Sequence, residues 1–126
     1  MEMKFLKCEV CGNVAMKFVD SGVKMVCCGQ NMTELVPNTT DAAGEKHVPV
    51  VERVSDDVIR VKVGSVEHPM IEKHHIAFIF VETERGGIRV DLDVDGKPEA
   101  EVFVGGEKVK AVYEYCNLHG LWKVDL

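Results

Sequence analysis

The stretch Ile88-Arg89-Val90-Asp91-Leu92-Asp93-Val94 alternates apolar and charged residues without a break. A period of two is typical of a β-strand with one buried and one solvated face. Residues 59–63 alternate in the same way, whereas the wholly apolar run at residues 76–81 is expected of a strand covered on both sides. Residues 100–104 and 109–115 add two further candidate strands.

Turn signals separate these strands, notably Asp95-Gly96 and Gly105-Gly106. No segment has a convincing period of 3.6, and no internal repeat is apparent. Short strands joined by tight turns are typical of antiparallel sandwiches and small barrels. The sequence therefore predicts an all-β fold.

The first 36 residues carry a different pattern. Cys8-Glu9-Val10-Cys11-Gly12 is a C-x-x-C pair, in which a tight turn aims two thiolates at one ion, and Cys27-Cys28 supplies two more sulfurs. Neighbouring residues of an extended chain point to opposite faces, so Cys27 and Cys28 must be bent to share that ion. So short a segment buries too little apolar surface to fold alone, and metal binding is expected to hold it together.

A linker follows at Pro37-Asn38-Thr39-Thr40-Asp41. We therefore expect a metal-bound domain at residues 1–36 and a second domain at residues 37–126. A disulfide framework is the weaker interpretation of the cysteines, because a bridge between Cys27 and Cys28 would be strained and Cys116 would be left over.

Composition narrows the class of protein. The chain has 126 residues, 46% of them hydrophobic and 29% charged, with a net charge of −6. That balance is globular, and the acidic charge argues against a nucleic-acid partner. Residues 1–7 contain no apolar signal region, and no stretch reaches the length of a membrane span, so we expect a cytoplasmic protein with no membrane partner.

A second set of candidate ligands lies in the later domain. His47, His68, His74 and His119 occur at loop-like places, and His119 follows Cys116 in the sequence Cys116-Asn117-Leu118-His119. Imidazole and thiolate together select a transition metal over calcium or magnesium. The plainer alternative is a set of surface histidines and a buried cysteine.

These motifs resemble those of the desulfoferrodoxin family, which consists of two-iron superoxide reductases. Cys8, Cys11 and Cys27-Cys28 resemble desulforedoxin, and the rest of the chain resembles the superoxide reductase domain. The matching segments there are Glu45-Lys46-His47-Val48-Pro49, His68-Pro69-Met70 with His74, and Cys116-Asn117-Leu118-His119-Gly120-Leu121-Trp122-Lys123. His75 departs from the family, in which a tyrosine is common at this place.

The resemblance implies a small desulforedoxin-like domain followed by an immunoglobulin-like antiparallel β-sandwich, with two iron ions per chain. Iron centre I would be bound by Cys8, Cys11, Cys27 and Cys28 and would transfer electrons. Iron centre II would be bound by four equatorial imidazoles, those of His47, His68, His74 and His119, with the Cys116 thiolate axial. Its sixth position would be open to superoxide, which would be reduced to hydrogen peroxide.

The resemblance also implies roles for two charged residues and for partners. Lys46 would attract the anionic substrate and help to bring a proton, and Glu45 would be the carboxylate that occupies the vacant position of the oxidised iron. Taken alone, each is an ordinary loop charge. The implied partners are superoxide, a small electron donor such as a rubredoxin, and a second copy of the chain in a homodimer that detoxifies superoxide.

Two other functions stay open at this stage. A blue-copper electron carrier also places a Cys and a His close together on a β-sandwich, although it needs only two histidines and a weak axial Met. A zinc-ribbon binding module is the second, but it uses two separated C-x-x-C pairs, from which the adjacent Cys27-Cys28 departs.

Overall fold

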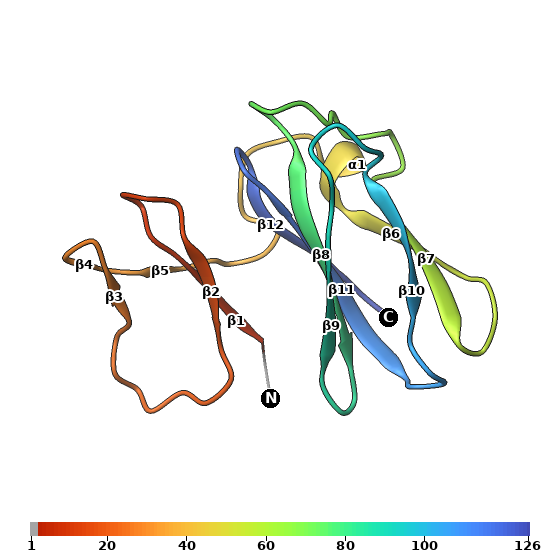
Figure 1. Cartoon of the computed structure of the whole chain (residues 1–126), viewed down its shortest axis with the longest axis horizontal. Coiled ribbons are helices and arrows are strands. Elements are labelled where there is room, and N and C mark those ends of the chain that lie inside the picture. Colours follow the sequence, from red (N-terminus) through yellow and green to blue (C-terminus); the bar gives the residue numbers. More distant parts are fainter. Residues whose placement is uncertain (1–2) are drawn as a thin grey trace. The chain divides into compact units, whose positions relative to one another are not determined.

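The computed structural model describes residues 3–126, which divide into two compact units, Met1–Val36 and Pro37–Leu126. We call them the N-terminal unit and the C-terminal unit. Apart from one short helix in the C-terminal unit, the regular secondary structure of both units is antiparallel β-strand (Figure 1), as the alternating patterns predicted. None of the helices within the described residues has the length and hydrophobicity that a membrane crossing requires.

The N-terminal unit contains two small sheets. The first has three strands in the order β2 (Val14–Lys17), β1 (Lys4–Lys7) and β5 (Thr33–Glu34). The second is a two-stranded ribbon of β3 (Val26–Cys27) and β4 (Gln30–Asn31). The strands are short because the chain turns back at each cysteine pair.

Very little of the N-terminal unit is buried. Among its described residues only Phe5, Leu6 and Cys8 are buried, whereas Phe18 and Val19 are 78% and 87% exposed. So little buried apolar surface cannot offset the conformational entropy of ordering the segment. This agrees with the expectation that a metal holds the unit together.

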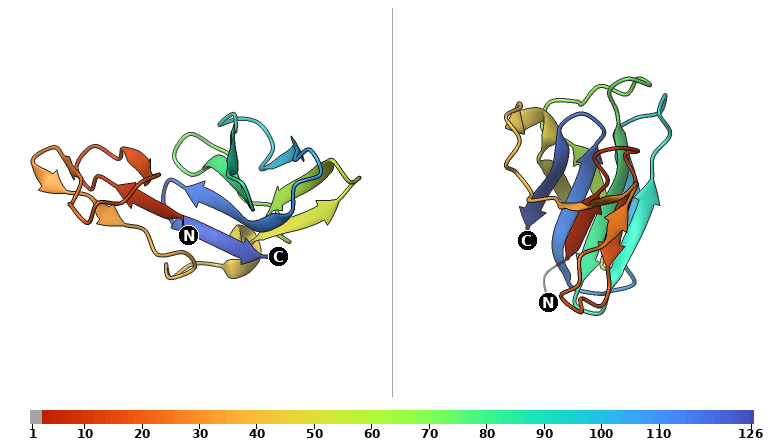
Figure 2. Two further views of the ribbon diagram at one scale, coloured as in Figure 1. Left: turned by 90° about the horizontal axis from the view of Figure 1, so that it is seen from below. Right: turned by 90° about the vertical axis from the view of Figure 1, so that its left-hand side faces the viewer.

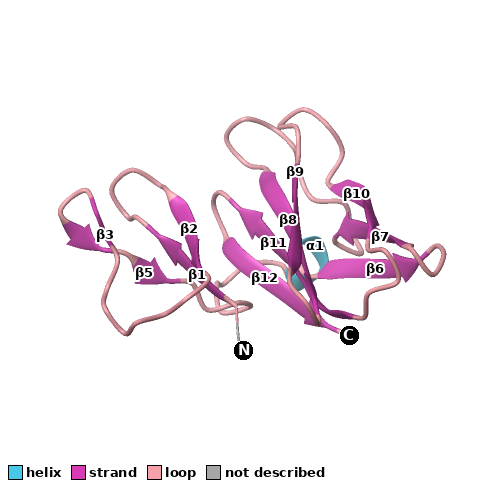
Figure 3. Ribbon diagram, turned by 60° about the horizontal axis from the view of Figure 1, so that its bottom comes forward, coloured by secondary structure: helices cyan, strands magenta, loops and turns pink. Residues whose placement is uncertain are grey.

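The C-terminal unit is a two-layer sandwich (Figures 1 and 3). One sheet has the order β10-β7-β6 and the other the order β12-β11-β8-β9, and all neighbouring strands are antiparallel. The elements of this unit are α1 (Gly44–His47), β6 (Pro49–Arg53), β7 (Val58–Val63), β8 (Ile76–Thr83), β9 (Gly87–Asp91), β10 (Glu99–Phe103), β11 (Val109–Cys116) and β12 (Gly120–Asp125).

The apolar core lies between the two sheets of the sandwich. Ile59, Val61 and Val63 project from β7 toward Ile79 on β8 and Val112 on β11, and each of these side chains is at most 1% exposed. Figure 2 shows the two layers from other directions. Because two separate sheets enclose this core, the fold is a sandwich and not a closed barrel.

Most expected strands are present, with small differences at their ends. The alternating stretch at residues 88–94 forms β9, which ends at Asp91. Strand β12 and strand β6 carried no clear signal: Leu121 and Trp122 are both buried although they are neighbours in β12, and Pro49 opens β6. An alternating pattern therefore did not identify a strand with both faces covered, or a strand that begins with a proline.

Two local irregularities position candidate ligands. Helix α1 makes one complete turn, closed by the Val48 N–H donating to the Gly44 carbonyl at 2.9 Å, and Pro49 favours an extended conformation at residue 48. The helix therefore stops at His47, whose side chain is buried. A β-bulge between β8 and β11 pairs Cys116 with Ile76 and leaves Ala77 as the extra residue.

Candidate metal centres

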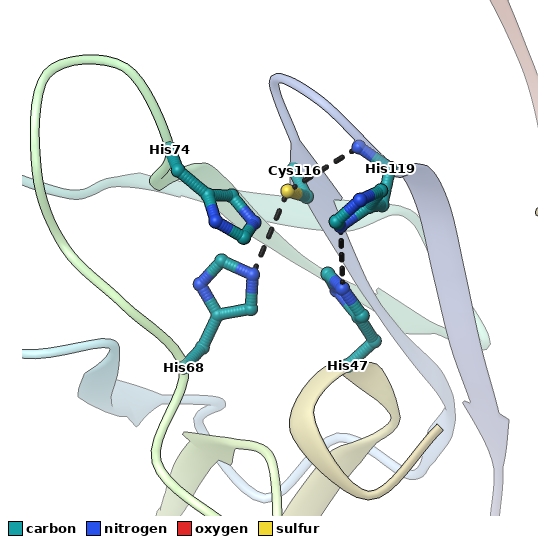
Figure 4. A group of neighbouring side chains, drawn as sticks. All are labelled: His47, His68, His74, Cys116 and His119. Atoms are coloured by element: carbon teal, nitrogen blue, oxygen red, sulfur yellow. Dashed lines mark hydrogen bonds between the residues drawn. The ribbon is translucent and has the colours of Figure 1, made fainter. Parts of the chain in front are cut away.

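Four histidines and one cysteine converge at one end of the C-terminal unit (Figure 4). One donor atom from each residue lies within 4.8 Å of every other. His47 ends α1, His68 and His74 lie in the segment between β7 and β8, and Cys116 and His119 flank the β11–β12 turn. Segments far apart in the sequence therefore supply a single cluster, which we call the five-donor group.

The four imidazole rings form a square. Neighbouring ring centroids are 4.6 Å apart for His47–His68 and His68–His74, 4.9 Å for His74–His119 and 5.0 Å for His119–His47. The diagonal His47–His74 distance is 6.4 Å. Adjacent rings meet edge to face at 62–88°. Such a square is the arrangement that four equatorial ligands require.

The ring nitrogens that face the middle can be identified from their contacts. His47 Nε2 and His119 Nδ1 are 3.1 Å apart, and His68 Nε2 lies 3.6 Å from the Cys116 sulfur. His74 Nε2 is a buried nitrogen with no hydrogen-bond partner among residues 3–126. A buried polar atom without a partner is costly, and a metal ion would satisfy it.

The protonation of these rings also fits a metal. Burial, reinforced by the neighbouring imidazoles, lowers the pKa of His47 to about 4. Burial likewise lowers the pKa of His68 to about 4, although its hydrogen bond to the Pro69 carbonyl opposes the shift. The pKa of His74 is lowered chiefly by burial as well. Neutral imidazoles at physiological pH keep the lone pairs that bind a transition metal.

The cysteine of the group is completely buried. Cys116 is 0% exposed, and its sulfur accepts the backbone N–H of His119 at 3.4 Å. Burial raises the pKa of the thiol, while the N–H groups of His119 and Leu118 oppose that shift. A bound cation would favour the thiolate further, so metal binding and deprotonation are coupled here.

Two further residues support the ligands, of which Glu114 was not predicted from the sequence. Glu114 is 0% exposed and places its Oε2 atom 3.4 Å from His47 Nδ1, the nitrogen that faces away from the centre. Burial raises the pKa of Glu114 well above its usual value. Trp122 stacks on the His47 ring at 4.8 Å and 11°, and its Nε1–H donates to the His119 carbonyl at 3.0 Å. Carboxylates and carbonyls on the outer nitrogen of a histidine typically orient metal ligands.

A signal for Glu114 was present in the sequence. Glu114 stands two residues before Cys116, so both side chains share one face of β11. That face points into the sandwich, where a charged residue needs a partner.

Glu45 and Lys46 lie beside the group but outside it. Both side chains are exposed on α1. The positive charge of Lys46 contributes to the lowered pKa values of His47, His68 and His74, which places that charge near three of the four rings. The Glu45 backbone is held by the Val66 N–H at 2.9 Å and the Ser65 hydroxyl at 3.2 Å.

Two other residues near the ligands have structural contacts instead. His75 donates from Nδ1 to the carbonyls of Ile71 and Glu72 at 3.2 and 3.0 Å. The Met70 sulfur accepts the Ile76 N–H at 3.3 Å and is not one of the converging donors. Four imidazoles without a thioether favour the five-donor site over a blue-copper site.

The four cysteines of the N-terminal unit form the second cluster, which we call the four-cysteine group. Their sulfurs also lie within 4.8 Å of one another. Cys11 and Cys27 approach to 3.7 Å, and the Cys11 N–H donates to the Cys8 sulfur at 3.4 Å. Cys28 has a φ of 51°, an unusual left-handed conformation, and its sulfur lies within 4.8 Å of the other three. The two neighbouring cysteines are bent so that both sulfurs join the same cluster, an arrangement that could hold one ion.

The turn at the C-x-x-C pair follows the expected course. Gly12 has a φ of 83° and donates its N–H to the Cys8 carbonyl at 2.9 Å. Asn13, not singled out from the sequence, donates from its side chain to the Cys27 sulfur at 3.6 Å.

Backbone N–H donors, that of Cys11 above all, lower the pKa of Cys8 to about 6, whereas the neighbouring Cys11 and Cys8 raise the pKa of Cys28 to about 12. Four adjacent sulfurs share negative charge poorly unless a cation is bound between them.

The fold and its two clusters define a class of all-β metalloproteins with a four-thiolate site and a mixed imidazole–thiolate site. Comparison with known families is consistent with this. The desulfoferrodoxin model matches residues 39–125, and the model of the desulfoferrodoxin N-terminal domain matches residues 1–35. The chain belongs to the desulfoferrodoxin family.

Individual relatives agree with this assignment. A desulfoferrodoxin of Syntrophotalea carbinolica is 47% identical, over 98% of this chain and 97% of its own. A superoxide reductase of Thermococcus kodakarensis is 34% identical over 68% of this chain and 90% of its own. The crystal structure of the superoxide reductase from Treponema pallidum superposes with a TM-score of 0.83 at 36% identity, covering 99% of this chain and 100% of that one.

Proposed function

We propose that this protein is a superoxide reductase, an oxidoreductase that adds one electron and two protons to superoxide to give hydrogen peroxide. The observation that carries the proposal is the convergence of five nitrogen and sulfur donors within 4.8 Å in the C-terminal unit. Relatives described as superoxide reductases support it. Ferrous iron held by this group would supply the electron.

The ligands we propose for this iron, centre II, are His47, His68, His74 and His119 with Cys116. Five protein donors would leave a position on the iron open for the substrate. Glu114 and the Pro69 carbonyl hold the outer nitrogens of His47 and His68, so the two rings keep their orientation. Buried Cys116 places a thiolate where water has no access.

Lys46 and Glu45 are proposed to act on the substrate side. Superoxide is an anion and the chain carries a net charge of −6, so the global field opposes its approach. The exposed ammonium of Lys46 lies near three of the ligand rings and offsets that repulsion locally. Lys46 is also proposed to help bring a proton to the reduced oxygen. Glu45 is proposed to provide a carboxylate to the oxidised site.

Cys8, Cys11, Cys27 and Cys28 are proposed to hold a second iron, centre I, that stores or passes electrons. Four thiolates complete a tetrahedral set, which leaves no position for substrate. We propose residues 1–36 as the domain of this centre and residues 37–126 as the superoxide reductase domain. The two family models divide the chain close to this boundary.

The remaining roles follow from the same proposal. A reductase needs an electron source, for which we propose a small donor protein such as a rubredoxin. We propose a homodimer in the cytoplasm that removes superoxide as a detoxification step. The exposed apolar side chains of the N-terminal unit, Phe18, Val19 and Val23, offer a contact surface for the second copy.

The experiment is a pulse radiolysis measurement on the reduced, iron-loaded protein. We expect rapid oxidation of centre II by superoxide, hydrogen peroxide as the product and no dioxygen, together with two irons per chain by metal analysis. Dioxygen and peroxide in equal amounts would show dismutation instead. A single copper per chain would identify an electron carrier.

A further inference from the structure

The rings of the five-donor group are not all held in the same way. His47 is held at Nδ1 by Glu114 at 3.4 Å, and His68 donates from Nδ1 to the Pro69 carbonyl at 2.7 Å. His74 is half-buried, and neither nitrogen of its ring hydrogen-bonds to another of the described residues. The position of the His74 ring must therefore depend strongly on the backbone that carries it.

That backbone is held on both sides by one residue, Asn117. The Asn117 Oδ1 atom accepts the N–H of His75 at 2.9 Å, and its Nδ2 donates to the carbonyl of Lys73 at 3.0 Å. The backbone N–H of Asn117 also donates to the His75 carbonyl at 3.2 Å. The His75 N–H can only donate and the Lys73 carbonyl can only accept. The side-chain amide of Asn117 therefore has one possible orientation.

The other contacts of this segment are local. Ile71 and His74 exchange two backbone hydrogen bonds of 3.0 Å, which close a turn within the segment itself. The ring of His75 donates to carbonyls of the same turn. These bonds shape the turn but do not attach it to the β11–β12 turn. Asn117 extends the attachment beyond the last strand pair, which is Ile76 with Cys116.

We propose that Asn117 is a positioning residue that fixes the His74 segment to the turn carrying Cys116 and His119, and thereby keeps His74 in the ligand set. The inference rests on the proposed function only in taking the five-donor group as an iron site. The His74 ring lies 4.6 Å from that of His68 and 4.9 Å from that of His119. Movement of this one segment would open two of the four sides of the square.

The test is the release of iron from the loaded protein to an excess of chelator. In Asn117→Ala we expect centre II to release iron about tenfold faster, the lower end of what outer-shell partners typically contribute. Centre I, in the same molecule, should release its iron at the wild-type rate. Hydrogen–deuterium exchange over residues 71–76 should increase, while exchange over strand β7 stays unchanged.

Asn38→Ala is the matched control. Asn38 also makes two side-chain hydrogen bonds to backbone within the C-terminal unit: it accepts the Lys123 N–H at 2.8 Å and donates to the Lys123 carbonyl at 3.0 Å. Its φ of 62° disfavours alanine, so this control is at least as demanding on stability. We expect iron release from centre II in Asn38→Ala to match the wild type.

Asn117→Asp provides a second variant if the alanine protein fails to fold. It keeps the acceptor for His75 but loses the donor to the Lys73 carbonyl, so centre II should release iron faster than in the wild type. Wild-type release from either Asn117 variant, or equal acceleration at both centres, would overturn the proposal. A protein that folds and binds iron but does not react with superoxide would refute the proposed function alone, because metal release does not depend on turnover.

Discussion

The four-cysteine group and the five-donor group differ in what holds their donors together. The donors of the first lie between residues 8 and 28, and only Cys8 is buried. The donors of the second span residues 47–119, and His47, His68 and Cys116 are buried. We therefore expect a bound metal to stabilise the fold of the N-terminal unit, whereas in the C-terminal unit the fold itself brings the donors together.

The same contrast separates the two kinds of chemistry. Four thiolates complete a tetrahedral set and would leave no position for substrate on an ion bound within them. Four imidazoles and one thiolate leave room for a further ligand, and the surrounding sandwich fixes the ring positions. A site that the fold preforms can keep its geometry when one coordination position is vacant. A site that depends on its metal for folding keeps its geometry less well under the same condition.

The largest expected effect comes from removing the thiolate of the five-donor group. Cys116→Ser should lower the rate of superoxide reduction at least about 100-fold, because even outer-shell residues contribute about 10- to 100-fold. Pulse radiolysis measures the rate, and visible absorption should show centre I intact. If Cys116→Ser reacts with superoxide as fast as the wild type, the assignment of superoxide reduction to the five-donor group is wrong.

Cys8→Ser should disrupt the N-terminal unit and leave the reaction at centre II unchanged. The N-terminal unit buries few apolar side chains, and structural metals contribute on the order of 10 kcal/mol to the folding of small domains. We expect this unit to unfold and one iron to be lost, while the first reaction of reduced centre II with superoxide keeps its rate. Iron analysis with circular dichroism tests this, and retention of two irons would contradict it.

Lys46→Ala tests the charge beside the five-donor group. We expect about a tenfold slower bimolecular reaction with superoxide and a weaker dependence on ionic strength, since local positive potential raises association rates of anions. Lys108→Ala is the control, because Lys108 is an exposed lysine whose only ion pair within residues 3–126 is a 4.0 Å contact with Glu84. Equal rates and equal salt dependence in the two variants would rule out a role for Lys46 in attracting substrate.

The smallest effect is expected from Trp122→Phe. Phenylalanine can still stack on the His47 ring, but the hydrogen bond to the His119 carbonyl is lost. We expect a decrease of about 1 kcal/mol in the free energy of unfolding of the C-terminal unit. Urea unfolding followed by circular dichroism measures it, and the absorption of centre I should report no change in the N-terminal unit. A loss of centre I absorption with no change in the stability of the C-terminal unit would contradict this prediction.

Sequence patterns predicted the fold class because its strands repeat a simple rule. Alternation at residues 59–63 and 88–94 located β7 and β9, and the apolar run at 76–81 located β8. The rule failed for β12, where Leu121 and Trp122 are both buried. The proposed domain roles and site assignments stay predictions.

The residues that support the ligands were harder to predict, for physical reasons. Asn117 was noted only as part of the stretch that contains Cys116 and His119. Its contacts with Lys73 and His75 cross 44 and 42 residues of sequence, which no local pattern records. Glu114 resembles the solvated charge of an alternating strand until its shared face with Cys116 is taken into account. Composition identifies donors, but only the tertiary fold identifies what orients them.

The wide separation of the donors in the five-donor group also sets an order of events during synthesis. His47 and His119 are 72 residues apart, so the ring square cannot form until the β11–β12 turn has been made. The four cysteines of the N-terminal unit are all present once Cys28 has been translated. We therefore expect the four-cysteine group to bind its iron earlier in synthesis than the five-donor group.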